Sequence, residues 1–226
     1  MHAFPLQSDW AFVLGSLDLL FEGLVVTVAL TAASIALGFL LGFPAGAVEV
    51  YGRGPLASIV ETAGVVLRGT PLLVIIIILF FVVSVSSSAF VTAAVALGLR
   101  SGAYQSQIFR GALQSVDEGQ LEAARSVGMG RLQAIRHVVV PQALRRSVPG
   151  FQNEFTIVLK DTSIAIVIGL GELLTVGQNL YQGGQSTAAL EIFLTVSLIY
   201  FVLTFTTNRT LDYVDDHFTI PGGEQA

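Results

Sequence analysis

Long apolar runs dominate this chain and alternate with shorter polar segments. A helix needs roughly 20 apolar residues to cross the hydrocarbon core of a bilayer, which is about 30 Å thick. Five stretches reach that length, at about residues 24–48, 59–85, 89–109, 151–170 and 188–207. The second stretch is interrupted by Arg68-Gly69-Thr70-Pro71. The pattern predicts an all-α protein with about five transmembrane helices.

The composition supports an integral membrane protein. Of the 226 residues, 53% are hydrophobic and only 12% are charged, whereas soluble domains usually carry about 25% charged residues. The net charge of -5 argues against nucleic-acid binding, which needs clustered cations. The absence of cysteine and the three scattered histidines argue against a metal site, and we expect no cofactor in this chain. A single transmembrane domain over residues 1–226, with its core at about 20–210, is predicted.

Arginine is concentrated in one connection between apolar stretches. Six arginines lie between Arg110 and Arg146, and no Lys or Arg precedes Arg53. The missing early cation argues against a cleaved signal peptide. Because cytoplasmic loops collect Lys and Arg, the 110–146 segment is placed inside. Alternation then puts the N-terminus outside, and the Arg53 loop and the C-terminus in the cytoplasm.

The polar segment between the third and fourth stretches predicts two short helices around a glycine. Ser115-Val116-Asp117-Glu118 has the form of a capping box, and residues 120–127 favour a short helix. Gly128 is placed to end it in a left-handed cap. A second helix is expected from about Arg131 and should stop before Pro141. The segment could be a rigid docking element or an ordinary amphipathic loop on the membrane surface.

Several motifs resemble one known family. Glu122-Ala123-Ala124, Gly128 and Val140-Pro141 resemble the EAA loop of permease subunits of ATP-binding-cassette (ABC) importers, and residues 119–125 are close to the form in polar amino-acid permeases. Other matching strings, in the family's order, are Arg68-Gly69-Thr70-Pro71-Leu72-Leu73, Ala103-Tyr104 with Ile108-Phe109-Arg110-Gly111, and Asn153-Glu154-Phe155 with Leu159-Lys160-Asp161-Thr162-Ser163. The resemblance covers about residues 23–200. The chain departs from the family where it has Gln107 instead of the usual glutamate, and Arg100 instead of a small or neutral residue.

The resemblance implies a type I ABC importer permease fold in a prokaryotic inner (plasma) membrane. Its coupling loop, at about residues 112–146, would dock on an ATPase dimer. The residues expected to couple are Glu122, Ala123, Ala124, Gly128 and Pro141. The other implied partners are a second permease copy or paralogue, an extracytoplasmic substrate-binding protein and a polar amino acid. The chain has no G-x-x-x-x-G-K-[ST] phosphate loop, so it is not expected to be an enzyme, and a separate ATPase would hydrolyse ATP.

The fourth apolar stretch carries three charges, on Glu154, Lys160 and Asp161. Each costs about 2.5–3.5 kcal/mol near the centre of a membrane helix, which favours a functional site. Glu154 and Asp161 are seven residues apart, so one helix would carry both carboxylates on one stripe. Two carboxylates and the chain's only lysine suit a zwitterion, and Thr162 and Ser163 add neutral donors and acceptors. We predict that these five residues bind substrate, with a structural Lys160–Asp161 pair as the alternative.

Other charged residues allow more than one interpretation. Arg68 is expected near the inner end of the second span, snorkelling to the interface, with substrate contact as the alternative. Arg100 could be a counter-ion to Glu154 or Asp161, or pair with a carboxylate elsewhere. The remaining acidic residues of the apolar regions, expected at the interface without a chemical role, are Glu61, Glu172 and Glu191.

Three glycines in the first span, Gly38, Gly42 and Gly46, have the spacing of small-residue helix packing. The contact could lie within one chain or between two. The function most favoured is an ABC permease for a polar amino acid. The alternatives are a permease for another small polar solute, an ion-coupled secondary transporter with Glu154 and Asp161 as proton carriers, and a membrane scaffold.

Overall fold

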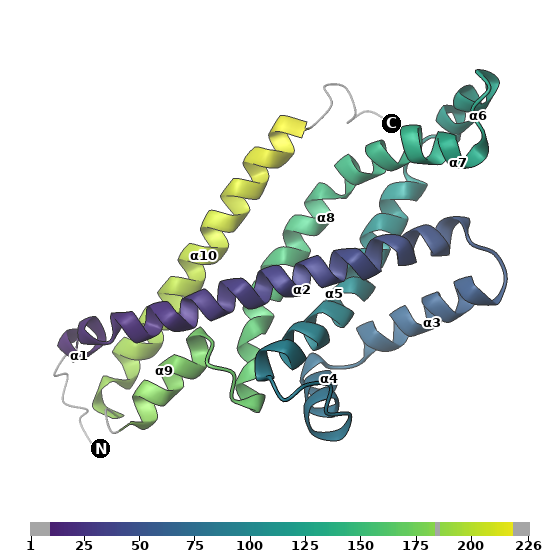
Figure 1. The fold of residues 1–226 in the computed structure, drawn as a ribbon. Coiled ribbons are helices and arrows are strands. Elements are labelled where there is room, and N and C mark those ends of the chain that lie inside the picture. Colours follow the sequence, from purple (N-terminus) through teal and green to yellow (C-terminus); the bar gives the residue numbers. More distant parts are fainter. Residues whose placement is uncertain (1–9, 184–185, 219–226) are drawn as a thin grey trace, which may run out of the picture.

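The computed structural model describes residues 10–183 and 186–218, and every regular element in these ranges is a helix (Figure 1). The α-helices are α1 (Trp10–Gly15), α2 (Leu17–Tyr51), α3 (Pro55–Gly69), α4 (Leu72–Ile77), α5 (Ala89–Gln114), α6 (Glu118–Ser126), α7 (Arg131–Ala134), α8 (Val140–Asp161), α9 (Leu173–Gln182) and α10 (Ala189–Phe218). The π-helical segments are η1 (Ile78–Val82) and η2 (Ile135–Val139), and the 3₁₀ segments are η3 (Thr162–Ile168) and η4 (Ser186–Ala188). The prediction of an all-α fold is confirmed.

Two helices of the described chain, α2 and α10, are by themselves long and apolar enough to cross a membrane. The second apolar stretch forms a broken span instead of one helix, because α3 and the α4–η1 segment are bent by 104° across the break at Thr70-Pro71. Pro71 disfavours helical backbone at the residue before it, and Thr70 is extended. Helices α5 and α8 also carry charged residues within their length, among them Arg100 in α5 and Glu154 in α8.

The fourth span differs from its predicted bounds of 151–170. Helix α8 begins at Val140 and ends at Asp161, where the backbone tightens into the 3₁₀ segment η3. The second helix of the polar segment does not stop before Pro141 either, since α7, η2 and α8 follow one another without a break. Pro141 sits in the first turn of α8, where a missing N–H group costs little. The same proline can therefore open a helix as well as close one.

Helices α2 and α5 form the tightest contact in the bundle. Gly38, Gly42 and Gly46 are buried, and a Cβ atom at Gly42 would lie 2.6 Å from the carbonyl oxygen of Gly102. Only a residue without a side chain lets two helix backbones approach this closely. The glycine stripe is thus a contact within the chain.

The main apolar core lies where α2, α4, α5, α8 and η3 meet, and its fully or nearly fully buried members include Leu30, Ile76, Leu97, Val158 and Ala165. A second cluster joins α1 and α2 to α9 and α10. A third joins the ends of α2 and α5 to the start of α8, beneath α6. In Figure 1, the α2–α3 connection and the α6–α7 segment lie toward the right of the bundle, whereas α1 and α9 lie at the opposite end.

Glu172 is fully buried rather than interfacial. Its carboxylate accepts hydrogen bonds from the backbone N–H groups of Leu174 and Thr175 and from the hydroxyls of Thr175 and Tyr200, at 2.7–2.9 Å. The charge therefore caps α9 and ties it to α10, a position where the helix dipole stabilises an anion. Glu191 is also buried, and of the three acidic residues expected at the interface Glu61 alone is exposed.

Candidate functional site

The charged residues of the membrane region meet where α5 crosses α8. Arg100 of α5 forms an ion pair with Asp161 at the end of α8, and each side chain is 23% exposed. The guanidinium carbon of Arg100 also lies 5.2 Å from the centre of the Tyr104 ring, a cation–π distance. Of the alternatives for Arg100, a counter-ion to Asp161 is the one that the structure contains.

Glu154 belongs to the same cluster. It is 4% exposed, and the groups facing its carboxyl group are the Ser101 hydroxyl, the Arg100 guanidinium and, further off, Asp161. Ser101 in turn accepts a hydrogen bond from the Gln105 side chain at 3.0 Å. The α5–α8 crossing thus brings two carboxylates near one guanidinium, with Glu154 buried and Asp161 partly exposed.

The backbone changes from α-helix to the more tightly wound 3₁₀ segment η3 directly after these charges. Thr162 and Ser163 each donate their hydroxyl hydrogen to the carbonyl three residues earlier, Leu159 and Lys160 respectively, at 2.7 Å. Thr162 is fully buried and Ser163 is half-buried. Their hydroxyl oxygens keep lone pairs that can still accept a hydrogen bond. The change from α-helix to 3₁₀ helix thus occurs directly beside the charged groups.

Lys160 lies apart from this cluster. It is exposed and makes no salt bridge among the described residues. The alternative of a structural Lys160–Asp161 pair is therefore wrong. Adjacent residues on a helix point in different directions, so Asp161 turns to Arg100 on the neighbouring helix while Lys160 projects outward. The structure groups Glu154, Asp161 and Thr162, and it adds Arg100.

Arg68 lies near the bend of the broken second span and not at either end of that span. It lies at the far end of α3, away from the Gly52–Gly54 connection, and donates to the carbonyl oxygen of Ala103 at 2.7 Å. Ala103 is in the middle of α5, so the guanidinium is held between two helices instead of reaching for the interface. The snorkelling expectation for Arg68 is wrong.

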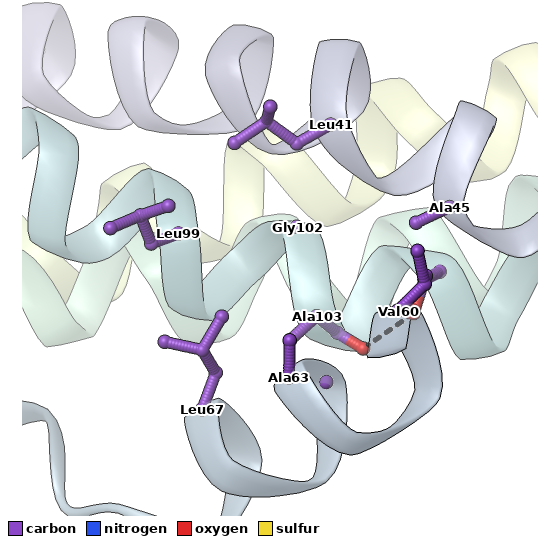
Figure 2. Close-up of a pocket in the computed structure, with 10 residues that line it drawn as sticks. Leu41, Ala45, Val60, Ala63, Leu67, Leu99, Gly102 and Ala103 are labelled. Carbon is purple, nitrogen blue, oxygen red and sulfur yellow. Dashed lines mark hydrogen bonds between the residues drawn. The ribbon is translucent and has the colours of Figure 1, made fainter. Parts of the chain in front are cut away.

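A cavity of about 160 Å³ lies between α2, α3 and α5 (Figure 2). Its lining residues are Leu41, Ala45, Val60, Ala63, Gly64, Leu67, Leu99, Gly102, Ala103 and Ser106. The one polar side chain among them, Ser106, already donates to the carbonyl of Ala103 at 3.0 Å, the dashed line in Figure 2. This cavity offers no partner to a zwitterion, and the charged α5–α8 crossing remains the candidate substrate site.

The second candidate site is the α6–α7 segment. Its first helix starts at Glu118, and its cap is Asp117, whose carboxylate accepts from the N–H of Gly119 at 2.6 Å. The predicted capping box is wrong, because Ser115 ends α5 and donates its hydroxyl to the carbonyl of Ala112. Aspartate and serine are both good N-caps, and in the structure Asp117, directly before the helix, takes this position.

Gly128 has the predicted left-handed conformation, with φ of 90°. Its N–H bonds to the carbonyl of Arg125 at 3.0 Å, and the N–H of Met129 bonds to that of Ala124 at 3.2 Å. This pair of bonds is a Schellman motif. It ends α6 sharply and turns the chain back into α7.

The surface of this segment mixes polar and apolar groups. Of the five residues expected to couple, Glu122, Ala123, Gly128 and Pro141 are exposed and Ala124 is buried. Two large apolar side chains beside them, Val127 and Leu132, are 76% and 79% exposed. These two side chains give the segment apolar area that a partner protein could cover. The sequence pattern alone did not single them out.

The base of the segment is fixed to the bundle. Arg146 of α8 donates to the carbonyl and hydroxyl of Ser115 at the end of α5, so the two ends of the segment are joined. Beneath this contact, Leu113, Val116 and Val139 are buried together. The exposed helices therefore stand on a packed base and can transmit a force to α5 and α8.

The described residues form an all-helical, largely apolar bundle with an ion pair between two of its helices and an exposed pair of short helices at one end, an architecture typical of membrane transport subunits. The chain belongs to the family described as binding-protein-dependent transport system inner membrane components, whose model matches residues 16–220. This family consists of transport components of the inner membrane, and the chain is a multi-pass member of it.

Curated relatives cover most of the chain. It is 35% identical over 205 residues to the glutamine transport system permease protein GlnP of Escherichia coli (strain K12), covering 88% of this chain and 92% of the relative. It is 36% identical over 199 residues to the octopine transport system permease protein OccQ of Rhizobium meliloti, with 81% and 82% covered.

Solved structures agree on the fold. The crystal structure of an amino acid ABC transporter with histidines contains a chain with a TM-score of 0.85 and 30% identity, covering 94% of this chain and 100% of that one. An inward-facing structure of the MetNI methionine ABC transporter has a TM-score of 0.78 at 24% identity, with 91% and 99% covered. The expected ABC importer permease fold is confirmed.

Proposed function

We propose that this chain is the permease subunit of an ABC importer for a polar amino acid. The observation that carries the proposal is the group of Arg100, Glu154 and Asp161 at the end of α8, where the 3₁₀ segment η3 begins. Charges of both signs in a membrane-spanning bundle are costly unless they serve a polar pathway. The named substrates of two relatives, glutamine and octopine, support an amino acid or a derivative of one.

The substrate site we propose consists of Glu154, Lys160, Asp161, Thr162 and Ser163. The ammonium of the amino acid would be held by Asp161 and, deeper, by Glu154, while exposed Lys160 would meet the carboxylate. The hydroxyl oxygens of Thr162 and Ser163 can accept from the ammonium. Arg100 forms an ion pair with Asp161 in the structure, and the substrate's ammonium would compete with the guanidinium for this carboxylate.

The docking surface we propose for the ATPase dimer is the α6–α7 segment. Glu122, Ala123 and Ala124 lie on its first helix, Gly128 shapes its turn, and Pro141 opens the helix that leads back into the membrane. Exposed Val127 and Leu132 supply apolar contact area. The six arginines from Arg110 to Arg146 support a cytoplasmic location for this segment, and the N-terminus would then lie outside and the C-terminus inside.

The remaining partners follow from this role. A second permease, either a copy or a paralogue, would complete the translocation path, and an extracytoplasmic binding protein would deliver the amino acid. ATP binding would close the ATPase dimer, draw the docking segments together and open the path to the outside. Hydrolysis would reverse this motion, so that the substrate is released to the cytoplasm.

The test is uptake of radiolabelled glutamine by liposomes that contain the permease with its binding protein, with and without the ATPase subunit and internal ATP. We expect uptake only when both ATPase and ATP are present. Uptake that follows a proton gradient in the absence of ATP would support the ion-coupled transporter instead. ATP-dependent activity that excess polar amino acids fail to inhibit would point to a different solute.

A further inference from the structure

A buried carboxylate lies near the end of α2, outside both candidate sites. The side chain of Glu49 is only 2% exposed. Its Oε2 atom accepts a hydrogen bond from the Gln107 amide at 2.7 Å and faces a guanidinium nitrogen of Arg110 at 3.3 Å. Burial of an ionised carboxylate is costly unless it is paired and hydrogen-bonded, so the contact with α5 defines one arrangement of the two helices.

This contact is directly next to the base of the α6–α7 segment. Glu49 is two residues before the end of α2, and Arg110 is four residues before the end of α5. The neighbours of Glu49 in the chain, Val50 and Tyr51, pack against the cluster that supports the segment. A displacement of that base must therefore act on Glu49 and Arg110 before it reaches the rest of α2.

Arg110 also connects to α3, but more weakly. Its guanidinium is 3.7 Å from the carboxylate of Glu61, whose side chain is 58% exposed. Exposed pairs contribute little because water screens them. One cation thus holds α2 firmly through Glu49 and α3 loosely through Glu61.

The amide at position 107 fits this arrangement in a way that a carboxylate would not. Gln107 donates to Glu49, and a glutamate in its place could only present a second negative charge to a buried anion. We call the contact of Glu49 with Gln107 and Arg110 the joint. It contains one buried carboxylate, supplied by α2, and one amide, supplied by α5. The amide at 107 and the carboxylate at 49 are therefore a matched pair.

We propose that Glu49 is a positioning residue for coupling. Through Gln107 and Arg110 it extends the close packing of α2 on α5 to the helix ends beside the α6–α7 segment, so that both ends follow when the ATPase displaces that segment. The proposal rests on the proposed function, because it assigns that segment to ATPase docking. Glu49 contacts neither substrate nor ATPase and acts only through α5.

The experiment compares four variants with the wild type in the complete transporter, reconstituted with ATPase and binding protein. Glu49→Gln removes the charge, Gln107→Glu adds a like charge, and the double variant exchanges the two groups between the helices. Glu61→Gln is the matched control, since it alters the exposed partner of the same Arg110. Three readouts are followed: assembly with the ATPase, ATP hydrolysis with and without loaded binding protein, and amino acids imported per ATP.

We expect each single variant at the joint to lower import per ATP about tenfold, a coupling typical of contacting charged groups. The exchanged pair should recover most of the loss because one carboxylate and one amide again face each other beside Arg110. Glu61→Gln should couple like the wild type.

Several results would overturn the proposal. One is wild-type import per ATP in Glu49→Gln, and another is an exchanged pair that couples no better than the poorer single variant or fails to assemble. An equal loss in Glu61→Gln would show that the charge of Arg110 matters and the α2 joint does not. Failure of the proposed function is distinguishable, since the wild type itself would then show no ATP-dependent import.

Discussion

Mutation of the Arg100–Asp161 pair can distinguish two interpretations of it: part of a substrate site, or a structural salt bridge. Removing one partner of a fully buried pair costs about 3–5 kcal/mol, whereas an exposed pair contributes about 0–1 kcal/mol. With both side chains 23% exposed, Asp161→Asn should destabilise the subunit by an intermediate amount, about 2 kcal/mol. For a chain of this size, that corresponds to a fall of about 4–8 °C in the apparent Tm.

The double variant Arg100→Gln with Asp161→Asn should recover only part of this stability, because no guanidinium is left without Asp161, while buried Glu154 loses the cation that acts on it. Transport should stay lost, since Asp161 is the group proposed to receive the substrate's ammonium. Thermal unfolding of the purified complex in detergent and uptake in liposomes measure the two properties separately. A double variant that regains both stability and transport would refute the reasoning and make the pair structural.

Lys160→Met supplies the matched control for this experiment. Lys160 is exposed and makes no ion pair among the described residues, so its removal should leave the apparent Tm unchanged. If it binds the substrate carboxylate, uptake falls all the same. Normal uptake in this variant would remove Lys160 from the proposed site.

Three further predictions concern the rest of the chain. A cysteine in place of Gln120, in this cysteine-free sequence, should be labelled only from the cytoplasm, and labelling from outside would reverse the proposed orientation. Gly128→Ala forces a φ of 90° on a residue with a side chain at a cost of about 1 kcal/mol, and should weaken ATPase association; Gly130→Ala, at φ of -65° and with open space around it, should not. Tyr200→Phe removes one donor from the carboxylate that caps α9 and should lower stability by about 1 kcal/mol, measured by thermal unfolding; an unchanged Tm would mean that this bond contributes nothing.

The positions of α2, α5 and α10 were predictable from the sequence, because burial in lipid demands long apolar runs that few other structures contain. The bounds of α8 were not. A proline can end a helix or occupy its first turn, and Pro141 does the second. The bend of the second span was signalled by Thr70-Pro71, but its size of 104° depends on how α4 packs against η3 and α5.

The candidate site was found in part. Three charges in one apolar stretch identified Glu154, Lys160 and Asp161, whose cost in lipid is large whatever surrounds them. The partner of Asp161 was not decided, since spacing along one helix says nothing about the helix beside it. Glu172 was misplaced for a related reason: glutamate is not a preferred helix cap, and its four donors are visible only once α9 and α10 are packed together.

The order of synthesis lets the ion cluster form in the bilayer with its cation in place before its carboxylates arrive. Helix α2 enters the membrane before α5, and its glycine stripe remains open until α5 arrives and packs into it. Pairing of α5 with α2 fixes the face on which Arg100 projects before α8 has been made. Glu154 and Asp161 then reach the bilayer when their cation is already in place. A ribosome-bound intermediate that ends after α5 needs to shield only one charge of the cluster, and a long arginine side chain can do so by reaching toward water.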